Sequence, residues 1–192
     1  MDFCSIASGS SGNCTYTGTD HTALLVDAGV SARQIEKGLK SIDRTATDID
    51  GILVTHEHSD HIKGLGVLSR RYGIPIYGTK GTLNAIANCS SLGSIDAGLY
   101  REIHVDEDFQ VGDVTVHPFE IPHDAAQPSA YRISHEETSV AVVTDLGVFS
   151  DYIIENMKGL DAVLLEANHD IRMLQAGPYP YYLKQRILGT HG

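Results

Sequence analysis

The sequence lacks several features that would set it apart from ordinary folded globular proteins. No apolar run approaches the roughly 18 residues that a membrane-spanning helix needs. The first residues contain neither the basic nor the apolar segment of an export signal. The three cysteines, Cys4, Cys14 and Cys89, form no CxxC pair, which is typical of a reducing compartment. We therefore expect a cytoplasmic protein with free thiols and no membrane partner.

Basic residues are also scarce. The chain has 14 lysines and arginines against 25 aspartates and glutamates, which gives a formal net charge of −11. Such a charge disfavours broad electrostatic binding to nucleic acid. It does not exclude a nuclease, because bound divalent cations are often the largest charges in a site. With 192 residues and 42% hydrophobic content, residues 1–192 are expected to form one domain, and nothing indicates an obligate protein partner.

Hydrophobic periodicity predicts an α/β fold. In the first half we expect strands at residues 3–7, 22–26, 51–55 and 75–77, and helices at 31–42, 64–72 and 79–87. In the second half we expect strands at 109–111, 114–121, 130–134 and 139–144, a short helix at 152–157 and a buried strand at 161–165. Two groups of strands with flanking helices predict two sheets packed together and covered outside by helices.

Four potential metal ligands follow the strand at 51–55, namely His56, His58, Asp60 and His61. Imidazoles and carboxylates suit zinc, manganese and iron. Four donors so close together cannot all reach one ion. Because alternate side chains of an extended segment share a side, His56 and His58 would bind one metal while the loop turns Asp60 and His61 toward a second. The run therefore predicts a two-metal centre.

Further ligands are expected where other strands end. His123 follows the strand at 114–121, and Asp145 follows the strand at 139–144. Asp145 could bridge the two ions, leaving a metal-bridging hydroxide as the nucleophile, because paired metals lower the pKa of a shared water. Asp27 ends the strand at 22–26 and is expected to orient a ligand histidine or a loop amide, with a turn cap as the alternative.

In order and placement, Asp27, the run at 56–61, His123 and Asp145 resemble the first four motifs of the metallo-β-lactamase superfamily. The resemblance implies an αββα sandwich. It also implies one metal on His56, His58 and His123, and a second on Asp60, His61, Asp145 and a final histidine. Segments 5–13, 165–170 and 177–181 are similar to the YycJ/WalJ group of proposed 5′-to-3′ DNA exonucleases, relatives of ribonuclease Z and ribonuclease J.

The resemblance has three further implications. Glu166 would take part in proton transfer, in addition to Asp60 and Asp27 as catalytic residues. The polar loop at 8–13 would lie near the site, or else be an ordinary turn. The group continues past residue 192 to its last metal-binding histidine, so we expect an αββα sandwich that lacks its C-terminal part; the alternative is that His169 or His191 takes the place of that histidine.

The leading functional hypothesis is phosphodiester hydrolysis on DNA, or on RNA, with two divalent metal ions. Zinc is expected first, with manganese or iron as alternatives. A second hypothesis is thioester hydrolysis of the glyoxalase II type at the same centre. A third is a metal-binding regulator without turnover.

Overall fold

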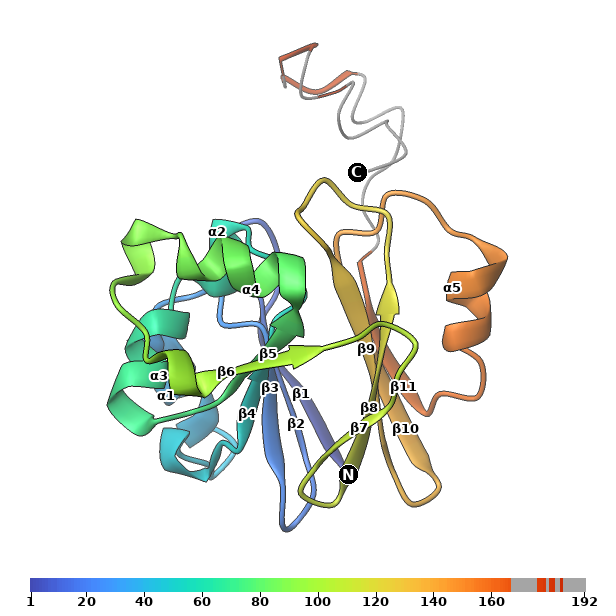
Figure 1. Cartoon of the computed structure of the whole chain (residues 1–192). Helices are drawn as coiled ribbons and strands as arrows, with labels where there is room; N and C mark the ends of the chain where they lie inside the picture. The colour runs from blue at the N-terminus through green and yellow to red at the C-terminus, as the bar shows by residue number, and fades with distance from the viewer. Residues whose placement is uncertain (167–175, 179, 182–183, 185–192) are drawn as a thin grey trace.

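Two sheets packed face to face form the centre of the protein, and helices cover their outer faces (Figure 1). The computed structural model describes residues 1–166, 176–178, 180, 181 and 184. The first sheet has the order β1-β2-β3-β4-β5-β6, with β1 Asp2–Ala7, β2 Cys14–Gly18, β3 Ala23–Val26, β4 Gly51–Leu53, β5 Ile76–Thr79 and β6 Tyr100–Ile103. The second has the order β11-β10-β9-β8-β7, with β7 Phe109–Val111, β8 Val114–Glu120, β9 Ser129–His135, β10 Thr138–Val143 and β11 Ala162–Leu165.

The helices lie on opposite outer sides of the sandwich (Figure 1). The first sheet is covered by α1 Ala32–Lys40, α2 Ser59–Ile62, α3 Leu65–Tyr72 and α4 Lys80–Ala87, and the second by α5 Asp151–Asn156. Short 3-10 turns lie at Ala46–Asp48, Ser90–Leu92 and Ala97–Leu99. Within the described residues, every helix is too short or too polar to cross a bilayer.

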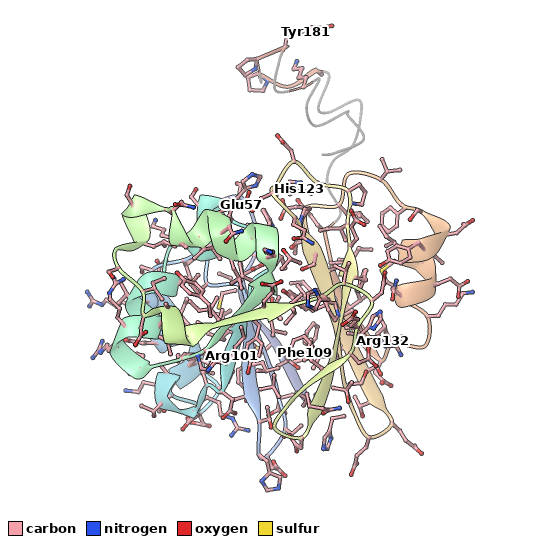
Figure 2. The ribbon with its side chains drawn as sticks, in the orientation of Figure 1. Glu57, Arg101, Phe109, His123, Arg132 and Tyr181 are labelled. Carbon is pink, nitrogen blue, oxygen red and sulfur yellow. The ribbon has the colours of Figure 1, made fainter. Side chains whose placement is uncertain are left out.

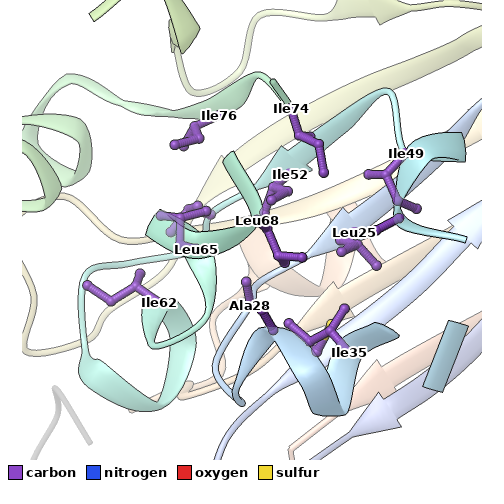
Figure 3. Close-up of a cluster of buried hydrophobic side chains, with 14 of the residues drawn as sticks. Leu25, Ala28, Ile35, Ile49, Ile52, Ile62, Leu65, Leu68, Ile74 and Ile76 are labelled. Carbon is purple, nitrogen blue, oxygen red and sulfur yellow. The ribbon is translucent and has the colours of Figure 1, made fainter. Parts of the chain in front are cut away.

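Three apolar cores hold these layers together. Leu25 and Ile52 point from the first sheet toward Ile35 and Leu68 of the helices (Figure 3). Successive side chains of a strand point to opposite faces, so Leu24, beside Leu25, enters the core between the sheets instead. Because both faces of β3 and β4 are covered, these strands are apolar throughout.

The third core lies between the second sheet and α5, where Phe119 and Val143 pack with Ile153. The ends of β3, β4, β8 and β10 carry the polar residues described below.

The structure corrects some element predictions. Strands β2 and β6 and the short helix α2 were not predicted. The strand at 161–165 was predicted to be buried, but β11 is the edge strand of the described sheet, and Val163 and Leu165 are 43% and 39% exposed. An apolar run identifies a strand here, but it does not tell whether the strand has a neighbour on each side.

Candidate metal centre

Side chains from several strand ends converge at one edge of the sandwich. His56 follows β4, whereas His123 follows β8 and Asp145 follows β10 of the other sheet. Potential ligand atoms of His56, His58 and His123 all lie within 4.8 Å of one another. The same holds for His56, His61 and Asp145. Two donor groups that share His56 therefore lie side by side.

The three-histidine group has the spacing that a metal ion requires. Nε2 of His123 lies 3.2 Å from Nδ1 of His58. The ring centroid of His56 lies 4.6 Å from those of both neighbours. Two nitrogens bound tetrahedrally at about 2.1 Å from zinc would stand about 3.4 Å apart. This group could therefore hold one divalent cation with little movement.

The protonation of His56 also fits a ligand. Burial, followed by the neighbouring His61, lowers the pKa of His56 to about 2, so the ring is neutral. Thr55 Oγ1 donates to Asp27 at 2.9 Å and therefore accepts from His56 Nδ1 at 3.0 Å. His56 Nε2 is left with its lone pair, buried and without a hydrogen-bond partner among the described residues. Such a group costs about 1–3 kcal/mol, which a bound cation would offset.

His61 is held between two carboxylates. Its Nδ1 lies 2.8 Å from Asp27 Oδ2, and its Nε2 lies 2.9 Å from Asp145 Oδ2. Burial alone would lower the pKa of His61, but Asp27 and Asp145 outweigh it and raise the pKa to about 10. The raised pKa favours the protonated ring of His61, and a cation beside Asp145 would compete with that proton.

Asp27 helps to orient two of the histidines: it contacts His61 directly and His56 through the hydroxyl of Thr55. Its carboxylate is only 1% exposed and accepts the backbone N–H of Thr55 at 2.9 Å as well as the Thr55 hydroxyl. Asp27 and Asp145 both adopt left-handed backbone conformations, with φ of 62° and 56°. Aspartate tolerates this region better than most residues, and the resulting sharp turn directs each carboxylate into the site.

Asp60 and Glu166 border the two donor groups. Asp60 Oδ2 lies 3.7 Å from His61 Nε2, and its side chain is 33% exposed. Glu166 accepts a hydrogen bond from the backbone N–H of Asp145. Burial and the Asp145 carboxylate raise the pKa of Glu166. His169 and His191, named from the sequence as substitute ligands, lie outside the described residues.

Two contributors were not singled out from the sequence. Thr55 links Asp27 to His56, and its only signal in the sequence is a polar residue at the end of a buried strand. Asn13 belongs to the loop at 8–13, for which the sequence allows either a place near the site or an ordinary turn. Its Nδ2 lies 3.0 Å from His61 Nε2, and its backbone N–H donates to the Asp60 carbonyl at 2.8 Å. The loop therefore does border the site.

Two hollows flank the donor groups. One, of about 150 Å³, lies between the loop at 8–13 and the carboxylates of Asp60, Asp145 and Glu166. The other, of about 470 Å³, extends from His123 toward Tyr152 of α5. Figure 2 shows His123 at the upper edge of the sandwich, between the two halves of the molecule.

Comparisons with known proteins agree with this arrangement. The beta-lactamase superfamily domain matches residues 22–179. The chain is 43% identical over 192 residues to the Bacillus anthracis protein named exodeoxyribonuclease YycJ, covering 100% of this chain and 72% of that protein. It is 42% identical over 187 residues to exodeoxyribonuclease WalJ of Streptococcus pneumoniae serotype 2 (strain D39), covering 97% and 70%.

Among solved structures, Zn²⁺-bound PqqB from Methylobacterium extorquens superposes with a TM-score of 0.70 at 20% identity. The match covers 88% of this chain and 64% of PqqB. At that identity the similarity concerns the fold.

Proposed function

We infer that this chain, which belongs to the beta-lactamase superfamily and to its YycJ/WalJ group, is a metal-dependent hydrolase that cleaves phosphodiester bonds of DNA. The observation that carries the proposal is the pair of donor groups joined at His56, because a two-cation centre requires two such groups side by side. Both relatives are named exodeoxyribonucleases, so DNA is the first substrate to test and RNA the second.

The proposed ligands divide between two cations. The first would be held by three imidazoles, those of His56, His58 and His123. The second would be held by one imidazole and two carboxylates, those of His61, Asp60 and Asp145. Asp145 also belongs to the group that contains His56, which supports the proposal that its carboxylate would help to hold both cations. We propose zinc first, with manganese or iron as alternatives, because sites of this composition accept all three.

The protein's own residues would orient these ligands and move a proton. When bound, divalent cations lower the pKa of a water molecule and neutralise charge that develops on a phosphoryl oxygen. Contacts of Nδ1 of His56 with Thr55 and of Nδ1 of His61 with Asp27 would favour the tautomers in which Nε2 can bind a cation. The raised pKa of Glu166 favours its protonated form, which can donate to the leaving oxygen.

The test is a nuclease assay on the protein with zinc or manganese. Single-stranded DNA with a 5′-phosphate, the same DNA with a 5′-hydroxyl, and S-lactoylglutathione would be compared. We expect cleavage of the 5′-phosphorylated DNA, loss of activity in His58→Ala, and unchanged activity in Glu107→Ala, a change of an exposed residue in the connection between β6 and β7. Hydrolysis of the thioester alone would contradict the proposal in favour of the thioesterase alternative. Metal binding without any turnover would favour the regulator.

A further inference from the structure

The loop that carries His123 brings one ligand of the three-histidine group in from the second sheet. It connects β8 to β9 and crosses to the first sheet, where the other two histidines of its group stand. His123 itself is 9% exposed, whereas Asp124, Ala126 and Gln127 around the turn are exposed. An exposed turn needs specific anchors to hold a buried ligand in place.

Two of those anchors lie at the far end of the loop. The Gln127 carbonyl accepts from Thr79 Oγ1 at 2.6 Å and from Thr82 Oγ1 at 3.1 Å. Gln127 Oε1 accepts the backbone N–H of Gly81 at 2.9 Å. These contacts fix the loop to the start of α4, which follows the strand β5 that pairs with β4.

A third anchor comes from within the histidine-rich segment. Glu57, between His56 and His58, accepts the backbone N–H of Ala126 through Oε1 at 2.8 Å. Figure 2 shows Glu57 and His123 near each other at the same edge of the molecule. The other Glu57 oxygen, Oε2, is buried and has no hydrogen-bond partner within the described residues. An incompletely paired buried carboxylate oxygen is costly, so this side chain is not explained by stability alone.

Glu57 is not placed as a ligand. The donor groups that could hold a cation contain His56, His58, His61, His123 and Asp145, and within the described residues Glu57 belongs to neither. Its contact is directed at the backbone of the loop that carries His123.

We propose that Glu57 is a positioning residue that fastens the Ala126 amide and thereby sets the position of His123 relative to His56 and His58. This inference rests on the proposed metal centre. Its chemical requirement is one acceptor oxygen at the position of Oε1. A glutamine can supply that oxygen and an alanine cannot.

The experiment compares the unaltered protein with Glu57→Ala, Glu57→Gln and Glu107→Ala. Each would be titrated with Co²⁺, whose visible absorption reports ligand geometry, and the exchange of the Ala126 amide would be followed in metal-free protein. We expect Glu57→Ala to weaken Co²⁺ binding by about 10–100-fold, to alter the absorption bands, and to speed the amide exchange at least about tenfold. Glu57→Gln and the control should stay within about threefold of the unaltered protein.

The outcomes separate this inference from the proposed function. Equal Co²⁺ affinity and spectra in Glu57→Ala and unaltered protein would overturn the role of Glu57 and leave the metal centre standing. Failure of the unaltered protein to bind Co²⁺ would overturn both. Loss of Co²⁺ binding in Glu57→Gln as severe as in Glu57→Ala would also contradict the inference, because the acceptor oxygen would then not be what matters.

Discussion

At the scale of single residues, the Asp27 carboxylate organises more of the site than its place in the sequence reveals. It accepts from Thr55 twice and lies 2.8 Å from His61 Nδ1. Asp27→Asn keeps the shape but replaces one acceptor oxygen with an amide donor that cannot accept from His61. We expect zinc affinity to fall about 10–100-fold, as measured by competition with a chromophoric chelator. A zinc affinity within twofold of that of the unaltered protein would show that Asp27 does not help to organise the metal centre.

Cys14 provides a second test at this scale. It is fully buried, and burial, followed by the Asp27 charge, raises the pKa of its thiol. Because the thiolate is the reactive form, Cys14 should stay unreactive at pH 8, while Cys4 and Cys89, which are partly exposed, react. Titration with a disulfide reagent should count two thiols in the native state and three in denaturant. Rapid reaction of all three thiols in the native protein would show that the core containing Cys14, between the first sheet and its helices, is open to solvent.

At the scale of elements, two segments support the histidine-rich run. The Ala28 N–H donates to the His61 carbonyl, and the Gly29 N–H donates to the Asn13 carbonyl. A Cβ at Gly29 would lie 1.6 Å from the Asp60 carbonyl oxygen. The turn after β3 and the loop at 8–13 therefore pack directly against the backbone that presents Asp60 and His61.

Gly29→Ala tests this packing. The added methyl group must push the backbone at Asp60 away, so we expect unfolding free energy to fall by about 3 kcal/mol or more. Gly98→Ala is the control, because a Cβ there is at an ordinary 3.4 Å from its nearest neighbour. Urea unfolding of both variants measures the difference. If Gly29→Ala is as stable as the control, the close packing described here is wrong.

Most elements were predictable because their signals are local. Ser31 caps α1 as predicted, and the apolar runs at 22–26 and 139–144 correspond to β3 and β10. Strand β2, Cys14–Gly18, was missed because it contains no aliphatic residue and begins directly after a glycine-rich loop, although its threonines and tyrosine favour a strand. Helix α2 has four residues, too few to show a helical period.

The residues of the site can likewise be divided into those that the sequence predicts and those that it does not. His56, His58, His61, His123 and Asp145 follow strand ends, so their convergence was predicted. Thr55 and Asn13 act through contacts between segments 28 and 48 residues apart, which spacing in the sequence does not reveal. The comparisons confirm the superfamily and the αββα sandwich, while the assignment of ligands to two cations stays a prediction.

At the scale of the whole molecule, charge decides when a nucleic acid can bind. The net charge is −11, and one hollow beside the site is bordered by three carboxylates. DNA would be repelled unless bound cations reverse the local charge. We expect a phosphorothioate oligonucleotide, which resists cleavage, to bind at least about tenfold more weakly in EDTA than in zinc. Fluorescence anisotropy measures this, and equal binding under both conditions would show that another surface holds the DNA.

The central claim is that imidazoles and carboxylates from both sheets bind divalent cations at one edge of the sandwich. Anomalous diffraction at the zinc edge, from crystals of zinc-loaded protein, tests it most directly. The account predicts one peak at bonding distance, about 2.1 Å, from nitrogens of His56, His58 and His123, and a second beside His61 and Asp145. Zinc bound elsewhere, with no peak among the three histidines, would contradict it.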